Sequence, residues 1–449
     1  MATKLCRLAQ KARNEPATQF VNLFHLLQEG LLRECFAKLR GDAAAGIDEI
    51  TKADYGRDLE ENLAALVGRL HTMSYRPQPV RRVYIPKPGT DKQRPLGIPV
   101  LEDKLVQAAM VRILEQIYEQ DFIEDSYGFR PERSCHDALR ALSETVERGD
   151  IEWVVEADIK GFFDHVDHDH LMRFLNHRVG DPRMQRMVKR FLIAGVTEEG
   201  VFTASEEGTP QGGVISPLLA NLYLHYVLDL WYERAFRKVC RGRTRLIRYA
   251  DDFVVCFEYQ ADAERFQREL VTRLAKFGLE VEPSKTQVIA FGPRAAGRAL
   301  KEGKAKPETF DFLGFTHYCS RRKDGTGFRM KRRTARKRFR AKLSAFGQWL
   351  QQGRAKMKTR ELWHAAGQKL EGHYRYYGVT DNYPSLQQFA HQAERVIFVW
   401  LNRRGGKRKL TWEKFRKMAQ RIPLPRPRIH VHFFKPRPRE RQGYLFTTT

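Results

Sequence analysis

The chain has 449 residues, 42% of them hydrophobic, and a formal net charge of +26. This hydrophobic content excludes wholesale disorder, and the length predicts two or three domains. No run of about 18 apolar residues is present to predict a membrane span, and the N-terminal residues lack the apolar centre of a signal peptide. The six cysteines include no Cys-x-x-Cys pair, so neither a zinc ribbon nor a disulfide framework is predicted. We therefore expect a reducing, cytoplasmic location.

The positive charge lies in the C-terminal third of the chain. Residues 321–449 contain 34 Lys and Arg against 7 Asp and Glu, whereas residues 1–320 contain 46 against 47. A near-neutral body with a strongly basic appendage predicts a polyanionic partner, most simply a nucleic acid. A merely soluble basic surface is the alternative, but like charges at this density repel one another unless a partner neutralises them.

Residues 1–75 are predicted to be helical, with apolar spacing over 20–27 and 59–70. The loop 41–48 is bounded by glycines, but it lacks the Lys-Ser/Thr ending of a nucleotide-binding P-loop. It is therefore not predicted to bind a nucleotide in that way.

Residues 81–98 predict two short strands around a Pro-Gly turn, with Lys87 and Arg94 on either side of it. Paired cations on a hairpin suit a triphosphate. A charged, solvated sheet edge is the alternative, and the local sequence does not separate the two. Core helices are predicted next, over residues 102–119 and 135–146.

A buried strand is predicted to run into Asp158, and Gly161 breaks the chain before the next helix. An acid at the end of a core strand suggests a functional position, with a helix cap as the competing interpretation. Several His and Asp residues follow within 165–170. Their spacing fits no zinc pattern, so we interpret them as a helix N-terminus with acidic caps.

The loop 208–217 is rich in glycine and proline and precedes a long amphipathic helix predicted over 218–236. Its paired glycines would let the main chain approach a ligand closely, although a plain loop before a helix has the same composition.

Residues 246–257 read as strand, tight turn and strand, with Asp251 and Asp252 at the turn. Two adjacent carboxylates in an apolar setting repel each other, and partial burial adds to that cost. A bound divalent cation would relieve the repulsion, and a solvated hairpin turn is the alternative.

A helix is predicted over 261–276 and a strand over 310–315, so the body alternates strands and helices as α/β or α+β proteins do. Helices are then predicted over 331–350 and 360–377, where aromatic residues lie among Arg and Lys. That mixture suits nucleic-acid binding, and an amphipathic bundle with aromatic core residues is compatible with it. From residue 403 onward we expect a partly ordered basic tail.

The order of these motifs is more specific than any one of them. Asp158 after a strand, Gln211 in a Pro-Gln-Gly loop, a Tyr-Ala-Asp-Asp hairpin and the later Lys285 together resemble reverse transcriptases. Residues 370–377, with the sequence Leu-Glu-Gly-His-Tyr-Arg-Tyr-Tyr, resemble the maturase (thumb or X) domain of group II intron reverse transcriptases. The resemblance covers about nine-tenths of the chain.

This resemblance implies an α+β right-hand polymerase, with fingers and an antiparallel palm sheet followed by an all-α thumb. The implied domains are residues 1–75 (N-terminal extension and fingers helices), 76–320 (fingers and palm), 321–402 (thumb or maturase domain) and 403–449 (basic tail). It also implies an RNA-directed DNA polymerase that binds intron RNA and assists splicing. Its partners would be intron RNA template, DNA target or primer and dNTPs, without a membrane, in a bacterial-type cytoplasm or nucleoid.

The resemblance further implies that Asp158, Asp251 and Asp252 are catalytic and hold two Mg²⁺ ions, with Mn²⁺ as a substitute. Ile159 would contribute to both the metal and the dNTP site. The remaining dNTP contacts would come from Lys87, Arg94, Phe163, Gln211 and Lys285. Phe163 would exclude a ribose 2′-hydroxyl, and Lys285 would protonate pyrophosphate. The predicted nucleic-acid contacts are Arg332, Arg333, Arg336, Arg340, Tyr374 and Tyr376.

Two other functions remain open from the sequence. The chain could be an RNA-binding splicing factor with a relic polymerase site, although all three acids are present. It could also be a domesticated or defence-type reverse transcriptase. No cysteine follows Cys319, so we expect no Cys- and His-rich endonuclease domain of the kind that many relatives carry.

Overall fold

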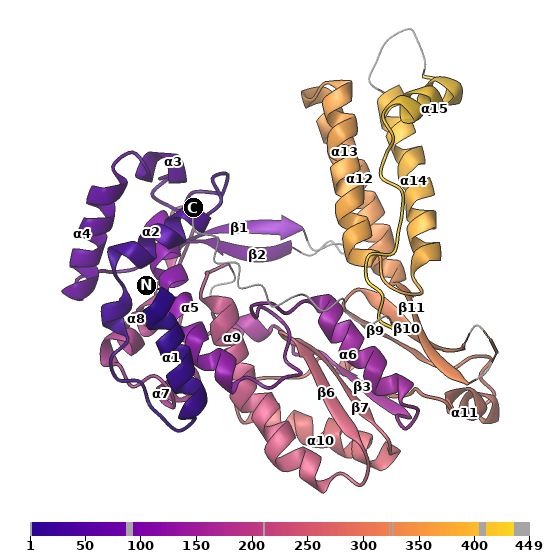
Figure 1. Ribbon diagram of the computed structural model, residues 1–449, viewed down its shortest axis with the longest axis horizontal. Coiled ribbons are helices and arrows are strands. Elements are labelled where there is room, and N and C mark those ends of the chain that lie inside the picture. Colours follow the sequence, from indigo (N-terminus) through magenta and orange to yellow (C-terminus); the bar gives the residue numbers. More distant parts are fainter. Residues whose placement is uncertain are drawn as a thin grey trace. The chain divides into compact units, whose positions relative to one another are not determined.

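The computed structural model describes residues 2–86, 93–209, 212–322, 324–325, 327–403 and 410–434. The chain divides into two compact units, which meet in the sequence at residues 290 and 291. Strands and helices alternate in the first unit, and helices dominate the second (Figure 1). The chain is therefore a mixed α+β protein, and its described strands pair in antiparallel fashion apart from one parallel pair in the first unit.

The first unit contains two four-stranded sheets. One has the order β2-β1-β4-β5, and its bounds are β1 (Val80–Pro86), β2 (Gln93–Ile98), β4 (Val196–Glu198) and β5 (Val201–Thr203). The other has the order β6-β7-β3-β8, and its bounds are β3 (Trp153–Ala157), β6 (Thr244–Tyr249), β7 (Asp252–Phe257) and β8 (Gln287–Ala290). The strands of this second sheet pair in antiparallel fashion, and the predicted hairpins at 81–98 and 246–257 are confirmed.

Helices flank the sheet β6-β7-β3-β8, and the α-helices of the first unit can be followed in Figure 1. They are α1 (Ala2–Asn14), α2 (Glu29–Lys38), α3 (Lys52–Tyr55), α4 (Leu59–His71), α5 (Leu101–Asp121), α6 (Cys135–Glu147), α7 (His168–Asn176), α8 (Pro182–Leu192), α9 (Ser216–Leu224) and α10 (Gln260–Ala275). Helix α10 packs on β3, β7 and β8, while α6 packs on β6. Buried side chains from most of these helices and from β3, β6 and β7 form one hydrophobic core, to which the buried residues of α6 do not belong.

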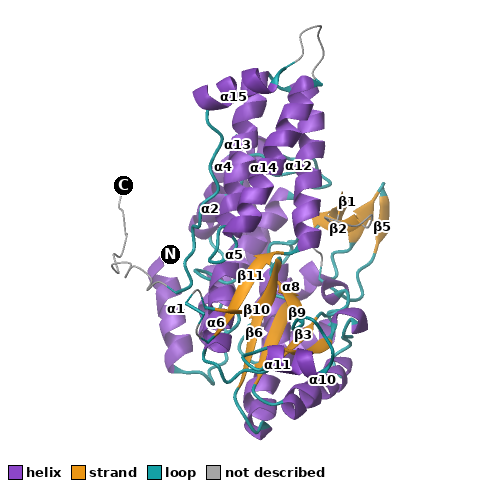
Figure 2. Cartoon of the chain, turned by 90° about the vertical axis from the view of Figure 1, so that its right-hand side faces the viewer, coloured by secondary structure: helices purple, strands orange, loops and turns teal. Residues whose placement is uncertain are grey.

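The second unit contains the three-stranded sheet β11-β10-β9 and a group of long helices. Its elements are α11 (Ala295–Lys301), β9 (Thr309–Phe312), β10 (Phe315–Arg321), β11 (Phe328–Thr334), α12 (Arg336–Lys356), α13 (Thr359–Tyr377), α14 (Tyr383–Asn402) and α15 (Trp412–Arg421). Helices α12, α13 and α14 pack against one another and run side by side (Figure 2).

Two predicted elements of the first unit take a different form. Residues 20–27 are not an α-helix; they contain only the 3₁₀ turn Phe24–Leu26, because Leu23 N and Phe24 N bond to the distant Asp181 carboxylate at 2.6 and 2.8 Å. The helix predicted over 218–236 is α9 followed by two π-helical segments, His225–Asp229 and Tyr232–Phe236.

Two predictions for the second unit are also corrected, and the structure adds detail to the tail expected from residue 403. The strand expected over 310–315 is a hairpin, since Leu313 and Gly314 take positive φ values of 49° and 80° between β9 and β10. Residues 331–334 belong to β11, so the helix predicted from 331 begins at Arg336. Residues 410–434 of the predicted tail form α15 and a segment that pairs Val431 with Val379.

Candidate active site

The antiparallel pairing of β3 with β7 brings acids from distant parts of the sequence to one end of the sheet. Ala157 pairs with Phe253, so Asp158, which follows Ala157, lies beside Asp252, which precedes Phe253. Tyr249 pairs with Asp252 across the β6–β7 hairpin, which leaves Ala250 and Asp251 as a two-residue loop. A left-handed residue, Ala250 at φ 56°, is what such a tight loop requires.

The charges at this sheet end act on one another. Burial raises the pKa of Asp251, the negative charge of Asp158 raises it further, and the cations Arg94 and Arg248 oppose this rise. Asp252 is exposed beside it. The predicted acids Asp158 and Asp251 are therefore electrostatic neighbours, and Arg94 of β2 acts on the same group.

Lys285 joins these acids from the 3₁₀ turn Pro283–Lys285. Its Nζ donates a hydrogen bond to Oδ2 of Asp158, and this bond is the main cause that raises the pKa of the lysine. The charge of Asp252 contributes in the same direction. The turn itself is fixed by the main chain, because Glu282 N donates to Asp158 O at 2.8 Å.

The donor set at this end of the sheet is chemically suited to Mg²⁺, which prefers carboxylate oxygens. Burial and the charge of Asp158 raise the pKa of the half-buried Asp251, and a nearby cation would offset both effects. Within the described ranges, no three or more His, Cys, Asp and Glu side chains are grouped as a metal site, and Asp158 is paired with Lys285. Ile159 has only 3% of its surface exposed, so a contact with an ion or dNTP would come from its main chain.

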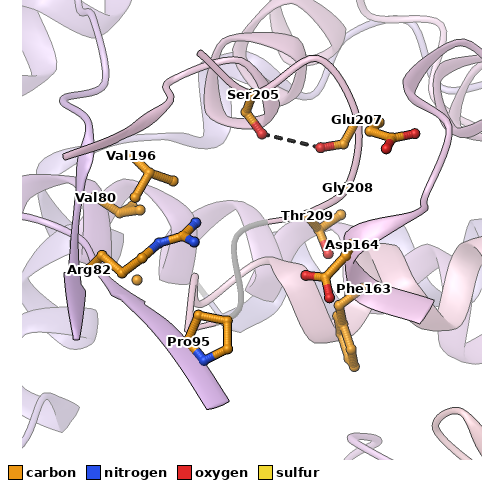
Figure 3. A pocket seen from close by; sticks show the side chains of 11 residues that line it. Val80, Arg82, Pro95, Phe163, Asp164, Val196, Ser205, Glu207, Gly208 and Thr209 are labelled. Atoms are coloured by element: carbon orange, nitrogen blue, oxygen red, sulfur yellow. Dashed lines mark hydrogen bonds between the residues drawn. The ribbon is translucent and has the colours of Figure 1, made fainter. Parts of the chain in front are cut away.

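A small cavity lies next to Phe163 (Figure 3). It has a volume of about 120 Å³, its lining includes Phe163, Asp164, Ser205 and residues 207–209, and Arg82 of β1 points into it. Ligand pockets usually exceed about 300 Å³, so this cavity could hold only part of a nucleotide.

The loop that lines this cavity is tied to the segment around Phe163. Gly208 N donates to Val166 O at 2.9 Å, and Thr209 N donates to Phe163 O at 2.8 Å. A Cβ at Gly208, where φ is 81°, would lie 2.9 Å from Phe163 O, so the close approach requires glycine. The predicted contacts Lys87 and Gln211 lie outside the described residues.

Sequence reasoning assigned no role to Arg82 or Arg248. The signal for Arg248 was its position between Ile247 and Tyr249 in β6, a strand that also contains Arg245. The structure buries it completely and pairs it with Asp229. Arg82 carried no such signal.

The predicted nucleic-acid contacts of the second unit separate by exposure. Arg333, Arg336 and Arg340 are exposed, whereas Arg332 and Tyr374 are 0% and 1% exposed. A fully buried side chain does not offer its charge or ring to a polynucleotide, so for these two residues we replace the predicted contact with a structural role. Tyr376 is half-buried, and its hydroxyl donates to Leu313 O at 3.0 Å.

Residues 85–317 match the family described as reverse transcriptase (RNA-dependent DNA polymerase). This range contains Asp158, Asp251 and Asp252. The chain belongs to the reverse transcriptase family. The resemblance drawn from the motifs is therefore confirmed, and the sheet that carries Asp158 and Asp251 lies inside the matched residues.

Several relatives of this reverse transcriptase carry names that refer to introns. It is 40% identical over 232 residues to the group II intron-encoded protein LtrA of Lactococcus lactis subsp. cremoris, an alignment that covers 50% of this chain and 38% of LtrA. It is 37% identical over 283 residues to protein YkfC of Escherichia coli (strain K12), covering 56% and 74%. It is 30% identical over 94 residues to nuclear intron maturase 1, mitochondrial, of Arabidopsis thaliana, covering 21% and 13%. The chain thus aligns with well under half the length of LtrA.

Among the described residues of this reverse transcriptase, no helix is both long and apolar enough to cross a bilayer. The family is described by RNA-dependent DNA polymerase activity, and polymerases of this family generally use divalent metal ions.

Proposed function

We propose that this chain is an RNA-directed DNA polymerase that joins a primer 3′-hydroxyl to an incoming dNTP and uses two Mg²⁺ ions, with Mn²⁺ as a substitute. The observation that carries the proposal is the pairing of β3 with β7, which brings Asp158 next to Asp251 and Asp252. Ions bound there supply the charge that activates the hydroxyl and stabilises the leaving pyrophosphate. The three aspartates would hold them, with the main chain of Ile159 alongside.

The other residues of the site have separate tasks in this proposal. The positive charge of Arg94 lowers the pKa of Asp251, so Arg94 acts on the acid site. Together with Lys87 it would hold the triphosphate. Phe163 would limit the space at the sugar, and Gln211 would lie beside the nascent base pair. Lys285 keeps its proton because of Asp158 and would deliver a proton to pyrophosphate.

We further propose that the protein binds intron RNA and assists splicing, as the names of its relatives suggest. The support is the charge of residues 321–449 and the exposure of Arg333, Arg336 and Arg340. A right-hand arrangement of fingers, palm and thumb, with domains at 1–75, 76–320, 321–402 and 403–449, stays part of this proposal. So does action on a DNA target in a bacterial cytoplasm or nucleoid.

The deciding experiment is Asp251→Asn, assayed for Mg²⁺-dependent dNTP incorporation on an RNA template. We expect a loss of at least about 1,000-fold, because the metal site supplies several kcal/mol of transition-state stabilisation. Splicing should persist, since it depends on RNA contacts elsewhere. Asp169→Asn changes an exposed aspartate of α7 in the same way and should keep full activity. Unchanged incorporation in Asp251→Asn would refute the polymerase site. If the wild type splices but incorporates no dNTP, and Asp251→Asn splices equally well, the splicing-factor alternative is favoured.

A further inference from the structure

A buried polar network is hydrogen-bonded to the turn that carries Asp251. Arg248 is 0% exposed, and its guanidinium makes two bonds to Asp229, from Nε to Oδ1 at 2.7 Å and from Nη2 to Oδ2 at 2.5 Å. Its Nη1 donates to Asn221 Oδ1 at 2.9 Å and to the main-chain oxygen of Ala250 at 3.0 Å. The guanidinium therefore connects a helix to the residue that precedes Asp251.

The segment around Gly128 also packs closely against this turn. A Cβ at Gly128 would lie 2.2 Å from Ala250 N, so only glycine allows this approach. Asn221 Nδ2 donates to Gly128 O at 2.6 Å, and the two main-chain bonds between Arg248 and residues 125 and 127 hold this segment against β6. Asn221 thus bonds to Gly128 and Arg248 at once.

The helix that supplies Asn221 and Asp229 is not a regular α-helix. Residues eight apart in an α-helix point about 80° away from each other. Here the chain from Asn221 to Asp229 ends in the π-helical segment His225–Asp229, and a π turn contains more residues and rotates less per residue. This reduced rotation accounts for how both side chains reach one guanidinium.

Stability alone does not explain such an ion pair. Replacing a buried pair with apolar residues is often neutral or stabilising, because the attraction only balances the loss of hydration. A planar guanidinium with several fixed donors, however, holds its acceptors in one geometry. Here one of those acceptors is the carbonyl of the left-handed residue Ala250.

We propose that Arg248, held by Asp229 and Asn221, is a positioning residue that fixes the Ala250–Asp251 turn in the geometry needed for catalysis. The importance of that turn rests on the function proposed above. Arg248 does not touch the reacting groups in this proposal; it acts through the carbonyl of Ala250.

The test compares Arg248→Lys with Arg178→Lys. Arg178 is also a buried, ion-paired arginine of the first unit. It bonds to Asp121 at 2.9 Å and to main-chain carbonyls of the N-terminal segment, and none of these bonds involves the Ala250–Asp251 turn. Amide hydrogen exchange is measured over residues 249–253 without metal or nucleotide. kcat, the KM for dNTP, template–primer affinity and the unfolding midpoint are measured in parallel.

For Arg248→Lys we expect exchange over 249–253 to become about tenfold faster or more. We expect kcat to fall about 100-fold, with KM and template–primer affinity changed by no more than about twofold. Arg178→Lys should lower the unfolding midpoint to a similar extent without either effect. Equal exchange and equal kcat in the two variants would overturn the proposal, and so would a kcat loss matched by the loss of template–primer affinity.

If Arg248→Lys does not fold, Gly128→Ala is the second variant in which exchange over residues 249–253 and kcat are measured. Its methyl group presses on Ala250 N from outside the ion pair, and the same change in exchange and kcat is expected. Wild-type exchange and kcat in a folded Gly128→Ala variant would count against the proposal. If the wild-type protein does not polymerise at all, the proposed function fails, and hydrogen exchange alone then decides whether Arg248 holds the turn.

Discussion

Lys285 forms an ion pair with Asp158, although 127 residues separate them in the sequence. The pair forms because β3 and the turn after Glu282 lie side by side, with Glu282 N bonded to Asp158 O at 2.8 Å. A lysine at this place neutralises one of the acids while no cation is bound. The lysine stays protonated there, because the hydrogen bond to Asp158 and the charges of the nearby acids raise its pKa.

Lys285→Met should slow single-turnover dNTP incorporation by about 100-fold or more, since it removes a positioned proton donor. Lys285→Arg should be slowed nearly as much, because a guanidinium keeps its charge but does not release its proton near neutral pH. Rapid-quench kinetics measures both. Lys276→Met alters an exposed lysine at the end of α10 and should leave the rate unchanged. A normal rate in Lys285→Met would exclude the proposed proton transfer.

Phe163→Ala should allow ribonucleotides into the site, because the ring is proposed to fill the space of a 2′-hydroxyl. The preference for dNTP over rNTP, as the ratio of the two kcat/KM values, should fall at least about tenfold. Phe202→Ala is a suitable control, since Phe202 of β5 is 57% exposed. Unaltered discrimination by Phe163→Ala would show that another residue selects the sugar.

Phe433→Ala should destabilise the second unit by about 3 kcal/mol, the usual cost of truncating a buried phenylalanine. Phe433 is 4% exposed, and its ring centre lies 4.2 Å from the guanidinium carbon of Arg332. Chemical denaturation measures the loss. Phe434→Ala, at a site that is 43% exposed, should cost clearly less. Equal effects of the two changes would mean that the segment is not part of the fold of this unit.

The basic tail, residues 403–449, belongs to the charged region that is proposed to bind RNA. The packing of its residues 428–434 limits which deletion can test that binding. Residues 428–434 bond to the main chain at Gly378 and Thr380, with His430 N 2.7 Å from Gly378 O and Thr380 N 3.0 Å from Val431 O. A deletion that begins at 403 would remove these bonds together with the basic charge. The informative deletion therefore begins after residue 434.

The stability of the protein should depend on the protonation of Glu115 in α5. Burial, and secondly the charge of Glu119, raise the pKa of Glu115 from 4.5 to about 7. The folded state therefore binds this proton more tightly than the unfolded state, and the stability it confers is present below pH 4.5 and is lost as the pH rises through about 7. Urea unfolding between about pH 5 and pH 8 should show this fall, and Glu115→Gln should reduce it. Glu144→Gln, an exposed change in α6, should not.

Local patterns predicted much of the sheet and of the acid site. The β-branched and apolar runs on either side of Asp251 and Asp252 determine a hairpin, and the apolar run before Asp158 determines a strand. Predictions from the sequence were wrong where contacts with residues far away in the chain changed the local structure or buried a side chain. The turn at Phe24–Leu26 depends on Asp181 from another part of the chain, and the burial of Tyr374 and Arg332 depends on how their neighbours pack.

The sequence by itself determined most of the elements, the acids at their ends and the basic C-terminal third, because periodicity, turn chemistry and charge are local properties of the chain. Only the tertiary structure decided that Asp158 lies beside the hairpin turn, that Lys285 binds it, and that Arg248 is buried against Ala250. Strand register and the direction of a buried side chain depend on contacts between residues far apart in the chain, and no local pattern specifies them.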